Sequence, residues 1–418
     1  MGEHQPQTNQ PQTNQPHVQR WEDQRWALDN VIRSVTIDWD QPRSFYLNAA
    51  CGMEASADFA AIRERVKKYA DIEPAFANTA RRREARAKAA EAEGALVTAR
   101  DNYFMAAIHW GSAQWSRYEN DETNLAFNRS KREAYTNYAR LAAHKIEPVF
   151  IPLNGGQMPG WFHLPPNYKG GRIPVVISFP GMDTYKEVFV ALKGDRWLER
   201  GIAVLALDGP GQAECRVMGL TVSMENWTQV GKAAVDWLMR RPEIDPEKIG
   251  AFGNSFGSFF VTIATANEPR IKACVANSNN LEPGFHSIFE EASPSYKKRF
   301  MYMAGFIDEA KFDAFRKTLT WEGHSTKIKV PYLCVTGEAD ELSPIVYSER
   351  MLAGMSNPRL FVIYQDARHA IGACPSVNMG PHPPTLVADW MAARLAGKPM
   401  ASERWFVENS GSVKKSPL

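Results

Sequence analysis

The pentapeptide Gly253-Asn254-Ser255-Phe256-Gly257 constrains this chain more than any other stretch. An apolar run, 248–252, precedes it and a second one, 258–266, follows it. These flanks predict a strand, a tight turn and a helix, with Ser255 on the corner between them. Small residues two positions before and after the serine let strand and helix pass closely, and the corner strains the serine backbone. We therefore expect Ser255 to be a nucleophile; an ordinary glycine-rich turn is the alternative.

A serine hydroxyl is a weak nucleophile at neutral pH, so it requires a histidine base and an acid that orients the histidine. On such a corner the acid and then the base come later in the chain. Nine histidines are present, and His369 alone follows a predicted strand, 359–365, by a short loop. The others precede Ser255, fall between predicted strands, or lie beyond the last strand. His369 is the predicted base, and a surface loop histidine is the alternative.

The acid is expected at the end of the preceding strand, 330–336. The loop there offers Glu338, Asp340 and Glu341. Asp340 is favoured because it completes a Gly-x-x-Asp loop, and Ser343-Pro344 then begins the next helix. Glu338 and Glu341 are interpreted as solvated turn charges.

Acyl transfer also requires an oxyanion hole, formed by backbone N–H groups aimed at the oxygen that becomes negative. The residue after the nucleophile, Phe256, supplies one N–H. The second is expected after the third predicted strand, 173–179, in Pro180-Gly181-Met182-Asp183. Met182 is preferred as its donor over Gly181.

Eight apolar runs indicate the fold class, and their apolarity is continuous rather than alternating. Such runs are typical of parallel strands that are buried on both faces by helices. The sequence therefore predicts an α/β fold, a mostly parallel, doubly wound sheet of eight strands. The runs are 146–152, 157–164, 173–179, 202–207, 248–252, 271–276, 330–336 and 359–365.

The remainder of the chain divides by composition. Residues 1–20 contain the repeat Pro-Gln-Thr-Asn-Gln and almost no apolar side chains, which predicts a disordered tail. Residues 21–144 are expected to form a helical cap segment, most clearly over 80–115. The catalytic domain is placed at 145–402, with a helical insertion at 281–328, and 403–418 is expected to be a C-terminal tail.

Aromatic residues in both helical regions are candidates for substrate binding. The apolar stretch 103–110 must be buried; it either packs inside the helical segment or lines a pocket through His109 and Trp110. Packing is the favoured interpretation of the two. In the insertion, which lies over the strand ends, Phe285, His286 and Phe289 are the corresponding candidates.

Charge and cysteine usage exclude several function classes. A net charge of +2 argues against a nucleic-acid partner. The five cysteines are odd in number and scattered, which is typical of free thiols in a reducing compartment. No apolar stretch reaches membrane-spanning length and no signal-peptide core begins the chain. We expect a cytoplasmic enzyme with a small-molecule substrate, no membrane partner, no metal and no cofactor; a homodimer is left open.

Several motifs together resemble a known group. They are Asp208-Gly209-Pro210-Gly211-Gln212, the Ser255 pentapeptide, Gly337 to Asp340, Ala388-Asp389-Trp390 and Leu395-Ala396-Gly397-Lys398. Over about 75–400 the chain resembles the α/β-hydrolase family that contains 2,6-dihydroxypseudooxynicotine hydrolase, fungal heptaketide-shortening hydrolases and fermentation-respiration switch proteins. It departs from that pattern at Ala213 and Ser258, where glycine is common.

The resemblance implies an α/β-hydrolase fold, a helical cap, and Ser255, Asp340 and His369 as a triad. It favours hydrolysis of a carbon-carbon bond beside a ketone, or of an ester, in an aromatic-sized substrate. The triad itself does not discriminate among an ester, an amide and a β-diketone. A cofactor-free lyase and a non-catalytic regulatory binding protein on the same fold stay open.

Overall fold

The computed structural model describes residues 15–193, 195–372 and 374–418. Most of the tail predicted at 1–20 therefore lies outside the described residues. Its last part is ordered, contrary to the prediction. The His17 N–H donates to the Ile307 carbonyl at 2.9 Å, and Val18 is fully buried. Burial of one apolar side chain and a contact to a distant loop hold this segment where composition alone indicated disorder.

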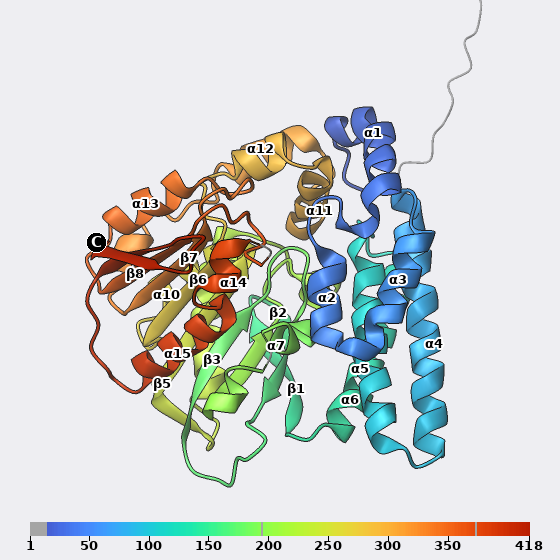
Figure 1. Cartoon of the computed structure of the whole chain (residues 1–418), viewed down its shortest axis with the longest axis horizontal. Helices are drawn as coiled ribbons and strands as arrows, with labels where there is room; N and C mark the ends of the chain where they lie inside the picture. Colours follow the sequence, from blue (N-terminus) through green and yellow to red (C-terminus); the bar gives the residue numbers. More distant parts are fainter. Residues whose placement is uncertain (1–14, 194, 373) are drawn as a thin grey trace, which may run out of the picture.

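One sheet of ten strands forms the centre of the molecule (Figure 1). Its order is β1-β2-β4-β3-β5-β6-β7-β8-β9-β10. Strands β3 to β9 run parallel to one another, whereas β1, β2 and β10 pair antiparallel with their neighbours. The strands are β1 Ile146–Leu153, β2 Gly156–His163, β3 Ile173–Phe179, β4 Ala203–Leu207, β5 Ile244–Ser255, β6 Ala273–Asn279, β7 Tyr332–Gly337, β8 Arg359–Tyr364, β9 Glu403–Val407 and β10 Val413–Pro417.

The eight predicted strands correspond to β1 through β8, so the predicted fold class is confirmed and the strand number is wrong. Residues 403–418, expected to be a tail, form β9 and β10. Strand β9 adds to the edge of β8 and buries only Val407 completely among its five residues. A half-buried strand near the edge of the sheet lacks the continuous apolar run that reveals a central strand, so the sequence pattern missed it.

Helices cover both faces of the sheet. On one face α9 and α10 pack against the side chains of Ile177 and Ala251, and on the other α7 and α15 pack against Val176 and Phe252. This arrangement explains why the central strands are apolar on both faces. The helices of this part are α7 Lys186–Leu192, α8 Ala213–Val217, α9 Met224–Leu238, α10 Phe256–Ala266, α13 Ile345–Ala353, α14 Pro375–Met379 and α15 Pro383–Leu395.

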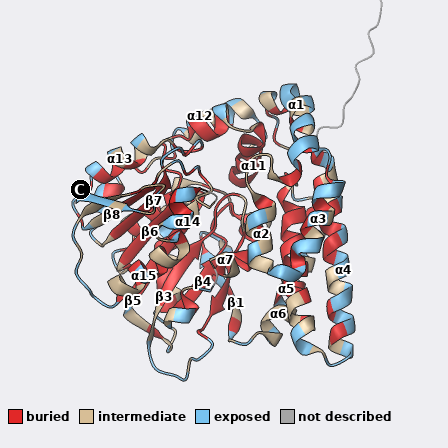
Figure 2. Ribbon diagram, viewed as in Figure 1, coloured by how far each residue is buried: buried red, intermediate tan, exposed pale blue. Residues whose placement is uncertain are grey.

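The N-terminal segment is helical, and it stands beside the sheet (Figure 1). Helix α5 is its centre, with 102–115 entirely buried, whereas α4 exposes its outer side (Figure 2). The stretch 80–115 is not one helix, because Gly94, at φ 78°, turns the chain between α4 and α5. The helices are α1 Gln19–Val35, α2 Arg43–Cys51, α3 Ser56–Arg65, α4 Ile72–Ala92, α5 Leu96–Trp115 and α6 Glu122–Leu141.

The insertion between β6 and β7 joins this helical segment to the sheet. It contains a π-helical turn, Ser287–Glu291, and the helices α11, Pro294–Ala304, and α12, Glu309–Arg316. Every residue of α11 is buried. Arg20 of α1 donates to the carbonyls of Phe289 and Ala292 at 3.1 and 2.9 Å. The two helical regions, distant in sequence, therefore pack as neighbours.

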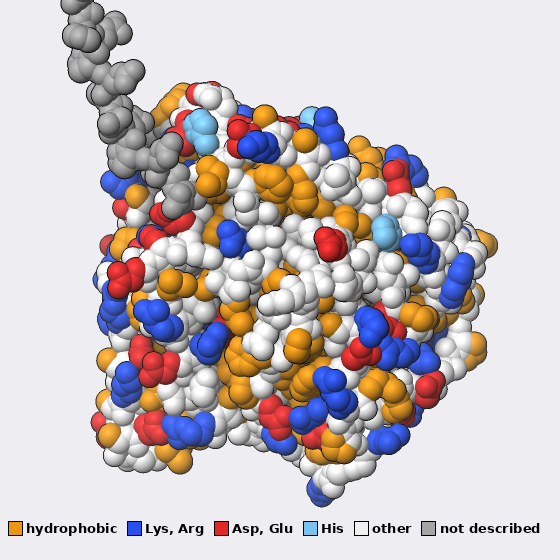
Figure 3. All heavy atoms as spheres, turned by 180° about the vertical axis from the view of Figure 1, so that it is seen from behind, with side chains coloured by type: hydrophobic (Ala, Val, Ile, Leu, Met, Phe, Trp, Pro, Cys, Tyr) orange, Lys and Arg blue, Asp and Glu red, His pale blue; other side chains and the backbone are white. Residues whose placement is uncertain are grey.

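Short 3₁₀ turns connect several of these elements. They are η1 Thr36–Asp38, η2 Met53–Ala55, η3 Tyr69–Asp71, η4 Leu198–Arg200 and η6 Ser325–Lys327. Lys and Arg side chains alternate with Asp and Glu over the face seen in Figure 3, in keeping with a net charge of +2.

Candidate active site

Ser255 occupies the corner between β5 and α10, with φ 55° and ψ −126°. This backbone conformation is rare for a residue with a side chain and stores strain. The glycines beside it are required by space. A Cβ on Gly253 would lie 1.8 Å from the Gly257 carbonyl oxygen, and one on Gly257 would lie 2.4 Å from the Phe179 oxygen. The pentapeptide pattern is thus explained by the close passage of β3, β5 and α10.

Three side chains from separate loops meet at this corner. The Ser255 hydroxyl donates to Nε2 of His369 at 2.8 Å. Nδ1 of His369 donates to Oδ2 of Asp340 at 2.9 Å. The other oxygen of Asp340 accepts the backbone N–H groups of Leu342 and Ser343 at 2.9 and 3.0 Å. The structure therefore joins the predicted nucleophile, base and acid in one hydrogen-bonded chain at the carboxyl ends of β5, β7 and β8.

The surroundings of His369 set its charge balance. Burial disfavours the imidazolium and by itself lowers the pKa of His369, whereas the charge of the Asp340 carboxylate and its hydrogen bond to the imidazole raise that pKa. Glu341 and Asp183 add negative charge nearby, so the net effect raises the pKa of His369 above its ordinary 6.5. The imidazolium that forms when a base accepts a proton is thus stabilised here.

Two glutamates that were interpreted as solvated charges have a further contact. Glu341 accepts the backbone N–H of His369 at 3.0 Å, and Glu338 accepts that of Asp366 at 3.2 Å. Both residues are exposed, as expected, but each carboxylate fixes the backbone of the loop that carries His369. No sequence pattern distinguishes a turn carboxylate with such a partner from one without it.

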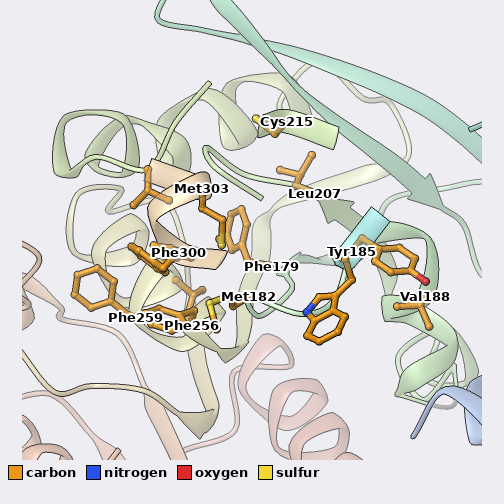
Figure 4. Close-up of a cluster of buried hydrophobic side chains, with 14 of the residues drawn as sticks. Phe179, Met182, Tyr185, Val188, Leu207, Cys215, Phe256, Phe259, Phe300 and Met303 are labelled. Carbon is orange, nitrogen blue, oxygen red and sulfur yellow. The ribbon is translucent and has the colours of Figure 1, made fainter. Parts of the chain in front are cut away.

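The loop after β3 lies directly against the nucleophile. A Cβ on Gly181 would be 3.0 Å from the Ser255 Cβ, so only glycine fits. The Gly181 N–H donates to the Thr184 hydroxyl at 3.1 Å and is therefore engaged within the loop. Met182, the next residue, is buried, and its side chain lies with those of Phe256 and Phe300 (Figure 4). This geometry favours Met182 over Gly181 as the second oxyanion donor beside Phe256.

The two cap candidates lie inside the helical segment. The Trp110 ring packs 5.4 Å from that of Phe127 on α6, and its Nε1 donates to Glu84 of α4 at 3.4 Å. His109 is fully buried, and its Nε2 lies 3.3 Å from Oδ2 of Asp58. These contacts favour the packing interpretation of both residues over the pocket interpretation.

The candidates of the insertion separate into two groups. Phe285 and Phe289 are fully buried in a cluster of phenylalanines, with ring centroids 4.8 and 5.9 Å from that of Phe256. Phe300 of α11 joins them at 4.6 Å from Phe256. His286 points outward, with 59% of its side chain exposed beside Glu291. The two phenylalanines therefore lie next to the proposed oxyanion donor, and His286 lies at the surface.

Sequence reasoning missed a buried polar cluster that touches the oxyanion loop. We call it the Asp183 cluster; it consists of Asp40, Arg43, Trp115 and Asp183. Arg43 of α2 donates to Oδ2 of Asp183 at 2.6 Å, and Trp115 of α5 donates to Oδ1 at 2.9 Å. These residues lie far apart in the sequence and match no motif, so no local signal could have identified them.

Other features of the described residues bear on the chemistry. Within 15–193, 195–372 and 374–418, no three His, Cys, Asp or Glu side chains are grouped as metal ligands. The five cysteines are free thiols, and all except Cys51 are buried. In the same part of the chain no helix combines the length and apolarity that crossing a bilayer requires.

Comparison with known proteins identifies the family. The model of FrsA-like esterases matches residues 76–334, which include Ser255 but end before Asp340 and His369. The α/β hydrolase xenA of Xenoacremonium sinensis is 28% identical over 233 residues, and the match covers 53% of this chain and 53% of that protein. The chain thus spans about half the length of this relative.

A second relative extends the match. The 2,6-dihydropseudooxynicotine hydrolase of Paenarthrobacter nicotinovorans is 28% identical over 291 residues, 67% of this chain and 74% of the relative. A crystal structure of 2,6-dihydroxy-pseudo-oxynicotine hydrolase superposes with a TM-score of 0.73 at 24% identity and covers 86% of this chain and 98% of the other. The resemblance drawn from the sequence motifs is confirmed. The chain belongs to the FrsA-like esterase family and has the α/β-hydrolase fold.

Proposed function

We propose that this protein is a serine hydrolase that cleaves a small carbonyl substrate through an acyl-enzyme. The observation that carries the proposal is the hydrogen-bonded chain from Ser255 through His369 to Asp340 on a strained strand-helix corner. A serine, a base within hydrogen-bonding distance and an acid that orients the base are the parts that nucleophilic acyl transfer requires. Membership of an esterase family supports the same reaction class.

The reaction begins when Nε2 of His369 takes the Ser255 proton as the hydroxyl oxygen attacks the substrate carbonyl. The N–H groups of Phe256 and Met182 stabilise the oxyanion that forms. Asp340 holds the imidazole in the tautomer whose Nε2 is free to accept, and it stabilises the imidazolium. His369 then protonates the leaving group, and water activated by the same imidazole releases the acid from Ser255.

Two kinds of leaving group, an enolate carbon and an alkoxide, are supported by the comparisons with relatives. A carbon-carbon bond beside a ketone releases an enolate carbon, and the named activity of the 2,6-dihydropseudooxynicotine relative favours a hydrolase for a ring-bearing substrate. An ester releases an alkoxide, and the esterase family model favours that choice. The phenylalanine cluster around Phe256 offers an apolar wall for an aromatic substrate in either case. Amidase activity, lyase chemistry without a cofactor, and regulatory binding without catalysis have no observation of their own in their favour.

The proposal is tested by active-site labelling with a small fluorophosphonate. Wild-type protein should be labelled and Ser255→Ala should not, with both proteins folded by circular dichroism. Turnover is then compared on an aryl acetate, an acetanilide and an aryl β-diketone. Cleavage of the β-diketone to two carbonyl products supports carbon-carbon hydrolysis, and cleavage of the aryl acetate alone supports an esterase. Absence of labelling in the folded wild type would overturn the serine-hydrolase proposal.

A further inference from the structure

The Asp183 cluster connects the helical segment to the loop that carries the proposed oxyanion donor. Asp183 directly follows Met182, and each of its two carboxylate oxygens accepts a hydrogen bond from a different helix. Arg43 of α2 binds Oδ2 at 2.6 Å, and Trp115 of α5 binds Oδ1 at 2.9 Å. A carboxylate held on both oxygens by charge-assisted and neutral donors has little freedom to rotate. The backbone beside Met182 is therefore tied to two elements outside the catalytic domain.

The two terminal nitrogens of the Arg43 guanidinium have several partners. Its guanidinium donates to both carboxylate oxygens of Asp40 and to the Ile37 carbonyl. It also lies over the rings of Trp39 and Trp115, 4.9 and 3.9 Å from their centroids. Only 5% of its side chain is exposed. A buried guanidinium with this many partners acts as a fixed anchor rather than a mobile surface charge.

Within the catalytic domain, hydrogen bonds hold the two ends of the same loop. The Gln212 side-chain amide donates to the Pro180 carbonyl, and Asp208 accepts the Lys186 N–H at 2.8 Å. Between these ends, the Gly181 N–H is engaged by Thr184 at 3.1 Å. The helical segment reaches this loop at two side chains. The Tyr185 hydroxyl donates to the Ile108 carbonyl at 2.5 Å near the end of the loop, whereas Arg43 and Trp115 hold Asp183, the residue beside Met182. Gly181 lies against Ser255, so a small displacement of the loop changes the distance between nucleophile and oxyanion donor.

We propose that Arg43 and Trp115 are positioning residues which, through Asp183, hold the Met182 N–H in register with Ser255. The helical segment thereby completes the oxyanion hole without contributing a reacting group. This inference rests on the proposed serine-hydrolase function. Removing an oxyanion donor outright lowers kcat by about 10² to 10³. Displacing it should have a smaller effect, about tenfold to a hundredfold.

The base supplies an independent readout. The Asp183 carboxylate is one of three acidic groups that raise the pKa of His369, together with Asp340 and Glu341. Asp183→Asn removes that charge and keeps the size of the side chain. The pKa seen in the acid limb of kcat/KM should therefore fall in this variant. A loss of packing alone would not lower that pKa, because burial depresses it and hydration of the imidazole would raise it.

The experiment compares Asp183→Asn, Arg43→Gln and Trp115→Phe with wild type. Steady-state kcat and KM on an aryl acetate and the second-order rate of fluorophosphonate labelling are measured, because the phosphonyl oxygen enters the same hole as the substrate oxyanion. We expect kcat and the labelling rate to fall about tenfold to a hundredfold in the first two variants, with KM changing less than about threefold. Trp115→Phe, which loses one N–H, should show a smaller loss.

Arg83→Gln is the matched control. Arg83 binds Asp58 at 2.6 Å inside the helical segment, with 13% of its side chain exposed, and it does not contact the oxyanion loop. It should keep kcat within about threefold of wild type even if its melting temperature falls. The double variant Arg43→Gln/Asp183→Asn should be no slower than the slower single variant, because both remove one interaction.

Wild-type kcat and labelling rates in folded Asp183→Asn and Arg43→Gln would overturn the inference, as would an equal loss in Arg83→Gln. If Arg43→Gln does not fold, Asp183→Asn and Trp115→Phe decide in the same way. Failure of the proposed function is distinct from failure of this inference. It appears as a wild type that is not labelled, or as equal labelling of Ser255→Ala.

Discussion

Two buried histidines, one in each half of the molecule, show what separates the catalytic domain from the helical segment. His369 and His109 both lie against an aspartate, at 2.9 Å from Asp340 and 3.3 Å from Asp58. Both imidazoles lose hydration. Yet the pKa of His369 is raised and that of His109 is lowered. Burial and one carboxylate are therefore not enough to make a base.

The other charges around each imidazole contribute to the difference between the two pKa shifts. Around His369 the additional groups are acidic, Glu341 and Asp183. Around His109, burial lowers the pKa, Asp58 opposes it, and Arg83 and Arg82 add positive charge. The same residue pair therefore favours a proton acceptor in one region and a neutral packing side chain in the other. The sheet domain carries the proposed reacting groups, while the helical segment contacts the loop beside them through Arg43 and Trp115.

The largest expected effect tests whether Ser255, the hydrogen-bond partner of His369, is the nucleophile. Ser255→Ala should lower kcat by about 10⁶, because the hydroxyl contributes chemistry and the triad acts as a unit. The melting temperature should stay within a few degrees of wild type. Single-turnover kinetics and thermal denaturation measure the two quantities. A variant that retained a tenth of wild-type kcat would show that Ser255 is not the nucleophile.

The next effect separates Asp340 from its acidic neighbours. Asp340→Asn should lower kcat by about 10⁴, since the amide favours the wrong imidazole tautomer. Glu338→Gln is the control, because its carboxylate accepts the backbone N–H of Asp366 at 3.2 Å rather than a proton of the imidazole. It should remain within a few-fold of wild type. Loss of activity in Glu338→Gln, with Asp340→Asn active, would reverse the assignment.

The third effect concerns the other histidine. His109→Ala removes a fully buried ring that packs 5.3 Å from Phe59 and 5.9 Å from Phe76. The free energy of unfolding should fall by about 2–4 kcal/mol, as for other large buried side chains. Values of kcat and KM on an aryl ester should be unchanged in the folded variant. An increase in KM without a loss of stability would instead place His109 in the substrate pocket.

The smallest effect is on pH dependence. A general base must be neutral, so kcat/KM should rise with pH through an apparent pKa above 6.5, the ordinary value for histidine. The contribution of His369 to folding stability changes with pH in the opposite direction to kcat/KM. The raised pKa of His369 contributes stability below pH 6.5 that is lost as the pH rises through its folded pKa. An acid limb below pH 6.5 in the free enzyme would contradict the arrangement around His369.

His109 should behave in the opposite way. Its lowered pKa means that the unfolded chain takes up the proton first as pH falls below 6.5, so its contribution to stability is lost towards acid. Comparison of wild type with a His109→Gln variant by urea denaturation between pH 5 and pH 8, a range of roughly one unit or more on each side of an ordinary histidine pKa, measures that contribution. An acid loss of stability equal in both proteins would assign it to other groups.

Much of the catalytic domain could be predicted because its signals are local. The central strands are continuous apolar runs, and the glycines at 253 and 257 are required by contacts within 3 Å. The loops that follow β7 and β8 were identified by their place in the chain. Prediction failed where burial is partial, as in β9, and where a segment such as 15–20 is ordered by a distant contact.

The sequence by itself determined the sheet, the strained corner at Ser255, and the loops that carry Asp340 and His369, because strand burial and tight turns depend on residues close together in the chain. The tertiary structure decided what surrounds these groups. It placed Trp110 and His109 in the helical interior and brought Arg43 and Trp115 to Asp183. Trp115 and Arg43 lie 68 and 140 residues from Asp183 along the chain. Contacts over such separations leave no periodic or local pattern in the sequence, so only the packed fold determines which residues meet.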